Sequence, residues 1–100
     1  MAKIFGERIK ELREARGLLQ RQVASLLDID APLFSKIERG ERVAKKGLVG
    51  NLAEILKVEK EQLLTLWLAD QVFEVVKNEE VADKALKSVS LTINSDKKKK

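Results

Sequence analysis

The side chains that could do chemistry in this chain are almost all charged, because the usual catalytic residues are missing. Its 100 residues include no histidine, cysteine or tyrosine, so the commonest general base and metal ligand are absent, as is any thiol or disulfide. The sequence has no glycine-rich phosphate-binding loop and no EF-hand spacing. Its carboxylates alternate with lysines and arginines, as they do on solvated helix faces. We therefore expect no enzymatic activity, no cofactor and no metal site.

The cations are unevenly distributed, and this distribution suggests a partner. Residues 1–58 carry 12 lysines and arginines against 8 acidic residues, residues 59–96 carry 4 against 8, and residues 97–100 are all lysine. A basic part followed by an acidic segment is typical of a protein that turns one face toward DNA and another away from it. Chance also produces imbalances of this size.

The element that must position these cations lies at residues 17–42, where the sequence predicts two short helices joined by a tight turn. The first runs from Gln20 to Leu27. The second begins after Asp30, a good N-cap, carries Pro32 in its first turn and ends at Gly40. Such a pair can place one helix in the major groove of DNA while the other braces against the backbone.

Helical periodicity predicts further helices at residues 5–16, 45–56 and 60–77, and a weaker one from Val81 to Val89. The residues expected to face inward from residue 45 to residue 56 are Leu48, Leu52, Ile55 and Leu56. The apolar stripe at 60–77 is broader than docking on one core requires, which suggests one surface for the core and one for a second protomer. Residues 88–93 alternate like a strand, so they would either pair across a dimer or be disordered, and we favour disorder.

The length suits one compact domain with an appendage. The first residues, MAKIFGERIKEL, do not resemble a signal peptide, and no stretch approaches the ~20 apolar residues that cross a bilayer. We expect a cytoplasmic protein that has no membrane partner.

The string LREARGLLQRQVASLLDID…FSKIERGER closely resembles the Cro/CI-type helix-turn-helix domain, the phage-repressor-like domain of the XRE family that is common in bacterial regulators. The resemblance covers residues 5–64. It implies an all-α fold, with a five-helix lambda-repressor-like domain and residues 31–39 as the recognition helix. It also implies that Arg13 and Glu38 form an ion pair between two helices, the alternative being two unrelated surface charges.

The resemblance further implies that Gln20 contacts a DNA phosphate at the start of the second helix. Leu19 departs from the pattern, because a Ser or Thr cap is usual at this position. The positions that would face the bases are Ala31, Pro32, Leu33 and Lys36.

The base-facing positions leave two interpretations open. Ala31, Pro32 and Leu33 offer only apolar contact with thymine methyl groups, so Lys36 alone could bond a guanine edge, and it could equally bind phosphate. Either the specificity comes partly from DNA shape, or this apolar tip binds a protein and DNA is not the ligand. The expected phosphate contacts are Gln20, Arg21, Ser35, Arg39, Arg42, Lys45 and Lys46. A cluster of merely solvated charges is the alternative, and it is strongest for Arg21.

We therefore expect a DNA-binding domain at residues 1–59, a helical dimerisation extension at 60–87 and a flexible basic tail at 88–100. The residues expected at the dimer interface are Leu64, Trp67, Leu68, Val72, Phe73 and Val76. The predicted function is that of a transcriptional regulator, repressor or activator, that binds double-stranded DNA as a homodimer. The alternative is a protein-interaction module or antitoxin-like partner of an unknown protein.

Overall fold

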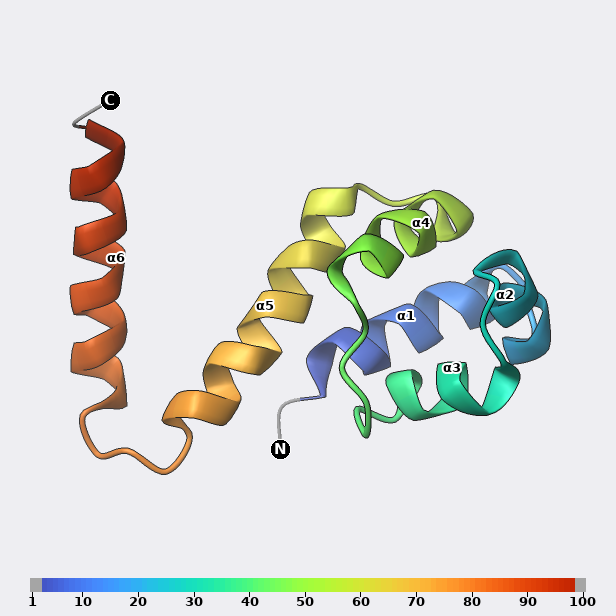
Figure 1. Ribbon diagram of the computed structural model, residues 1–100, viewed down its shortest axis with the longest axis horizontal. Coiled ribbons are helices and arrows are strands. Elements are labelled where there is room, and N and C mark those ends of the chain that lie inside the picture. Colours follow the sequence, from blue (N-terminus) through green and yellow to red (C-terminus); the bar gives the residue numbers. More distant parts are fainter. Residues whose placement is uncertain (1–2, 99–100) are drawn as a thin grey trace.

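The computed structural model describes residues 3–98, and over this range the chain consists of six helices and their connections, without strands (Figure 1). The helices are α1 (Ile4–Ala15), α2 (Gln20–Leu26), α3 (Ala31–Glu38), α4 (Lys46–Leu56), α5 (Lys60–Val76) and α6 (Ala82–Lys98). None of them combines the length and the apolar character that crossing a bilayer requires. The predicted all-α class is thus confirmed.

The first four helices and the beginning of α5 enclose one apolar core. Its largest fully buried side chains come from all five helices: Phe34, Ile9, Leu52, Leu63, Val23 and Val49. Apolar residues recur at three- and four-residue spacings along each helix, so each helix turns one stripe inward.

Helices α1 and α3 approach each other closely at Gly6. A Cβ atom built on Gly6 would lie 2.2 Å from the carbonyl oxygen of Glu38. Only a residue without a side chain fits here, because the obstacle is the backbone of α3 rather than a flexible side-chain end. Gly6 therefore allows the close approach of α1 and α3.

The ends of the predicted helix-turn-helix element follow from local chemistry. The Asp30 carboxylate accepts a hydrogen bond from the Leu33 N–H at 2.7 Å, which caps α3. Gly17 and Gly40 follow α1 and α3 with φ of +68° and +74°, a conformation that glycine adopts without strain. These predicted boundaries are confirmed to within one residue.

Helix α4 buries a somewhat different face from the predicted one. Val49, Leu52, Ala53 and Leu56 are buried, whereas Leu48 and Ile55 are only half-buried. The buried residues fall at the ideal spacing i, i+3, i+4 and i+7. The predicted set therefore omitted Val49 and Ala53 and included Leu48 and Ile55, which lie at the edges of the buried face.

Helix α5 has two apolar faces on opposite sides, as the breadth of its stripe predicted. Leu63 is fully buried, and Leu66 and Trp67 pack against the core. Leu68 is exposed and Val72 half-buried at about 140° and 180° around the helix axis from Leu63, and Phe73 is exposed nearer to the side of Leu66. Only the first half of α5 is covered by the other helices, and the second half projects beyond them (Figure 1).

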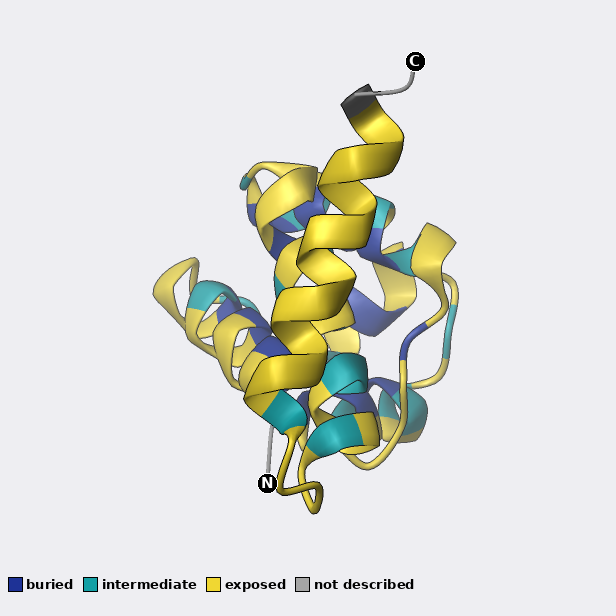
Figure 2. Cartoon of the chain, turned by 90° about the vertical axis from the view of Figure 1, so that its left-hand side faces the viewer, coloured by how far each residue is buried: buried dark blue, intermediate teal, exposed yellow. Residues whose placement is uncertain are grey.

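Helix α6 stands apart from the other helices (Figure 1), and after Ala82 its residues are exposed up to Lys97 (Figure 2). The expectation of a strand or a disordered segment at residues 88–93 is wrong, because these residues lie in the middle of α6. The alternation over six residues is real. It is contained in a longer helical pattern, in which Leu86, Val89 and Ile93 recur at i, i+3 and i+7. Of the predicted lysine tail, residues 99–100 lie outside the described range.

Candidate nucleic-acid interface

A buried polar network connects the three helices that present the candidate DNA-binding surface. The Arg13 guanidinium of α1 donates from Nε and Nη2 to the Glu38 carboxylate of α3, at 2.6 and 3.2 Å. Its Nη1 donates to the Leu18 carbonyl at 2.8 Å, and the Gln20 amide donates to Glu38 Oε1 at 2.8 Å. The side chains of Arg13 and Glu38 are only 9% and 2% exposed. The ion pair therefore fixes α3 relative to α1 and to the first residue of α2.

The start of α2 lacks the usual side-chain cap, because Leu19 occupies the capping position. Part of its role is taken by Gln22, whose side-chain oxygen accepts a hydrogen bond from the Leu19 N–H at 2.7 Å. This is one half of a capping box. Gln20, the predicted phosphate contact, is half-buried and is oriented by Glu38.

Helix α3 turns Phe34 and Ile37 into the core and its opposite edge outward. Of the predicted base-facing residues, Pro32 and Lys36 are exposed, whereas Ala31 and Leu33 are half-buried and pack partly against the core. Lys36 is thus the one long polar side chain among these four. The leading turn of the helix is accessible at Pro32 but offers no side-chain donor of its own.

Ser35 and Arg39 lie one helical turn apart and bond to each other through Arg39 Nη1 and Ser35 Oγ. Arg39 Nε also donates to Glu41 at 2.6 Å. This hydrogen bond lowers the pKa of the exposed Glu41 carboxyl and raises the pKa of Arg39. A phosphate that approaches the Nε edge of Arg39 therefore competes with Glu41, which binds this edge in the free protein.

Three of the predicted phosphate contacts surround a single open hollow between α1 and the helix-turn-helix element. Gln20, Ser35 and Arg39 line it, together with Lys3 and Lys10 and with the carboxylates of Glu7, Glu38 and Glu41. The sequence pattern does not single out these two lysines, since they lie on α1 and before it. Arg21, Arg42, Lys45 and Lys46 are exposed, and Lys45 and Lys46 stand at the uncapped start of α4.

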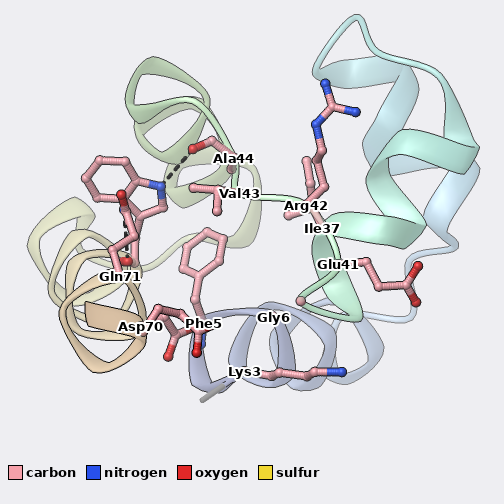
Figure 3. Close-up of a pocket in the computed structure, with 13 residues that line it drawn as sticks. Lys3, Phe5, Gly6, Ile37, Glu41, Arg42, Val43, Ala44, Asp70 and Gln71 are labelled. Atoms are coloured by element: carbon pink, nitrogen blue, oxygen red, sulfur yellow. Dashed lines mark hydrogen bonds between the residues drawn. The ribbon is translucent and has the colours of Figure 1, made fainter. Parts of the chain in front are cut away.

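Two polar contacts, which the sequence did not reveal, hold helix α5 against α1 and the loop between α3 and α4. The Asp70 carboxylate accepts hydrogen bonds from the Ile4 and Phe5 N–H groups at 3.2 and 3.0 Å, and so caps α1 from 65 residues away. The Trp67 indole donates to the Ala44 carbonyl at 2.8 Å, in the loop between α3 and α4 (Figure 3). A cavity of about 290 Å³ lies between these contacts, and Arg42 extends away from it (Figure 3).

The residues expected at a dimer interface divide between the two faces of α5. Leu64 and Trp67 are not on the outer face, because both pack against the core of their own protomer. Leu68, Val72, Phe73 and Val76 line an apolar groove on the outer face, which Thr65, Ala69 and Leu86 complete. Sequence periodicity alone gave no reason to separate these two sets.

The five packed helices, the tight α2–α3 turn and the outward edge of α3 define a helix-turn-helix domain of the Cro/CI type. Comparison with known proteins agrees. A family model described as a helix-turn-helix domain matches residues 4–66, and the chain belongs to this family of DNA-binding transcriptional regulators. The second half of α5 and the whole of α6 lie outside the match.

Individual relatives share this part of the chain. The HTH-type transcriptional regulator YazB of Bacillus subtilis is 31% identical over 62 residues, which are 62% of this chain and 90% of YazB. The HTH-type transcriptional repressor RghR of the same organism is 41% identical over 61 residues, 60% of this chain but only 45% of RghR. These relatives are regulators of transcription, a class distinct from enzymes.

A solved structure is also similar. The restriction-modification controller protein C.AhdI from Aeromonas hydrophila superposes with a TM-score of 0.55 at 37% sequence identity, over 59% of this chain and 86% of that protein.

Proposed function

We propose that this protein regulates transcription by binding a two-fold symmetric DNA operator as a homodimer, with α3 of each protomer in the major groove. The observation that carries the proposal is the rigid support of α3. Glu38 at its end is held by Arg13, its start is capped by Asp30, and its outer edge is left to a partner. Pre-organisation of this kind lowers the entropic cost of binding.

In this function the apolar tip and Lys36 share the reading of sequence. Pro32 contacts thymine methyl groups and Lys36 bonds guanine O6 or N7, while Ala31 and Leu33 support the tip. So few direct base contacts leave part of the specificity to DNA shape.

The phosphate contacts would come from both sides of α3. Gln20, Ser35 and Arg39 share one hollow, and Lys45 and Lys46 stand at the start of α4. The amides of that helix end carry no side-chain cap and favour an anion. Two recognition helices in a dimer would lie about 34–36 Å apart, one turn of DNA.

The proposal is tested by selecting bound sequences from random duplexes and then measuring affinity for the selected site at several salt concentrations. We expect a two-fold symmetric site and a steep decrease in affinity with salt. Lys36→Ala should relax the preference at one base position in each half-site. Binding without any sequence preference would overturn the specific-regulator function.

The double variant Lys45→Ala/Lys46→Ala tests the phosphate contacts separately. It should weaken binding to all sequences alike and lower the salt slope by about 0.9 for each phosphate that the protein no longer neutralises. The matched control is Lys57→Ala/Lys60→Ala, which removes the same charge beyond the other end of α4. If the slope of affinity against salt concentration is the same for this double variant, for the control and for the unsubstituted protein, Lys45 and Lys46 are excluded as phosphate-binding residues.

One observation favours a second candidate function. The leading turn of α3 carries Ala31, Pro32 and Leu33 without any side-chain donor, which suits a protein partner as well as thymine. A protein-interaction module, for example an antitoxin-like one, would use this tip for a protein. Absence of DNA binding even at low salt would select this function over the first.

A further inference from the structure

The apolar surface of the α5–α6 extension is too extensive for a free-standing segment. On α5 the groove is lined by Leu68, Val72, Phe73 and Val76, and of these Leu68 is 55% exposed. On α6, Leu86, Val89 and Ile93 lie on one side of the helix and are 39%, 54% and 49% exposed. An isolated helix of this length is only marginally stable in water, so its apolar side needs a cover.

We propose that the cover is a second copy of this chain, with α6 of each protomer lying along the outer groove of α5 of the other. This inference rests on the homodimer of the proposed function. It assigns the interface to exchanged α6 helices, with the connection at residues 77–81 as the crossing point.

The available area supports an exchange of α6 rather than a contact between two α5 helices alone. The exposed apolar side chains of the α5 groove offer on the order of 250 Å² per protomer, well below the roughly 800 Å² per partner of typical stable interfaces. Adding the apolar side of α6 and Val81 raises the exposed apolar area available for burial to about 600 Å² per protomer, or about 1,200 Å² over both copies. This total reaches the lower end of specific interfaces.

Charge complementarity favours α6 against α5 over two α6 helices against each other. Helix α5 contains 1 lysine and 3 acidic residues, one of which, Asp70, is bound to the start of α1, whereas α6 contains 4 lysines and 2 acidic residues. Pairing a basic helix with an acidic one lowers the electrostatic energy, and pairing two basic helices raises it. Opposite charges therefore accompany the apolar contact.

The second copy fits better than α6 of the same chain because of where α6 lies in the structure. Leu86 lines the edge of the groove, but α6 diverges from α5 beyond the connection (Figure 1), and Val89 and Ile93 on the same side of α6 remain 54% and 49% exposed. Exchange of an identical helix uses the contacts of an intramolecular hairpin and needs only an extended connection.

The first experiment measures the oligomeric state by sedimentation. Val89→Glu/Ile93→Glu places two charges on the apolar side of α6. The matched control Ser88→Glu/Ser95→Glu places the same charges on the opposite side of the same helix. We expect the control to remain dimeric and the first variant to raise the dimer dissociation constant by at least about 100-fold, because unpaired carboxylates are costly to bury. Trp67 fluorescence checks that the domain of either variant is folded.

The second experiment distinguishes exchange from folding back. The chain has no cysteine, so Ala69→Cys/Val89→Cys introduces the only two thiols. Exchange predicts an oxidised species of twice the chain mass on a non-reducing gel. An internal disulfide in a monomer would overturn the proposal.

These experiments distinguish a failure of the α6 exchange from a failure of the proposed homodimer. A dimer that survives Val89→Glu/Ile93→Glu would overturn the exchange of α6 while leaving the homodimeric regulator in place. An unsubstituted chain that sediments as a monomer at every concentration, with or without operator DNA, would overturn both.

Discussion

Replacing Glu38 by glutamine tests whether the buried ion pair holds the recognition helix in place. The substitution keeps the shape of the side chain but removes its charge, and leaves the Arg13 cation with 9% exposure and no counter-charge. Removing one partner of a buried pair costs about 3–5 kcal/mol. The glutamine oxygen can still accept one hydrogen bond, so we expect the lower end, about 3 kcal/mol. For a domain of this size this corresponds to a decrease in Tm of about 12–24 °C.

The assay is urea unfolding at constant pH, followed by the fluorescence of Trp67, the only tryptophan in the chain, with circular dichroism for Tm. The matched control is Glu11→Gln, which breaks the Arg8–Glu11 pair, whose side chains are 44% and 67% exposed. An exposed pair of this kind contributes at most about 0.5 kcal/mol. Equal losses in the two variants would refute the role assigned to Glu38.

A double variant separates the cost of an unpaired charge from the value of the pair itself. Arg13→Met with Glu38→Leu leaves no buried charge, and it should recover most of the stability that Glu38→Gln loses. If the double variant is as unstable as the single one, the hydrogen bonds to Leu18 and Gln20 matter more than the charge.

Three further substitutions test other parts of the structure. Gly6→Ala should lower the unfolding free energy by about 1–3 kcal/mol because its Cβ meets the α3 backbone. Gly47→Ala, with open space around it, should raise the unfolding free energy by up to about 1 kcal/mol. Urea unfolding should therefore give changes in unfolding free energy of opposite sign for the two variants. Asp70→Ala removes the acceptor for two N–H groups at the start of α1 and should cost about 1 kcal/mol, and an unchanged Tm would show that water replaces it. Glu41→Gln frees Arg39 and should strengthen binding to all DNA sequences about two- to fivefold in a fluorescence anisotropy titration, so weaker binding would contradict the competition between Glu41 and phosphate.

Most of the DNA-binding domain could be predicted from the sequence because its determinants are local. Apolar residues at helical spacing mark the inner faces, Asp30 caps the helix that it precedes, and Gly17 and Gly40 mark helix ends. The Arg13–Glu38 contact joins residues far apart in the sequence, and only the resemblance to a family predicts it.

The remaining features depend on contacts that no local pattern encodes. Asp70 is an ordinary acidic residue in an amphipathic helix until folding places it beside the start of α1. The two faces of α5 are visible in the sequence as one broad stripe, but the side on which Trp67 lies cannot be decided without its partner Ala44. At residues 88–93 a short period-two pattern competes with a longer helical one, and the longer one prevails in the structure.

The opposite faces of α5 have a mechanical consequence. One face of α5 is fixed to the first four helices through Leu63, Trp67 and Asp70, and the other carries the groove. The angle between these two faces around the helix axis follows from the spacing of their residues along the sequence. Inserting one alanine after Asp70 would leave Leu63, Trp67 and Asp70 in place but rotate Val72, Phe73 and Val76 by about 100° and shift them by about 1.5 Å, out of line with Leu68 and Ala69 of the same groove. The position of the groove around the axis of α5 therefore sets how the two DNA-binding domains of the proposed dimer would be oriented on one DNA molecule.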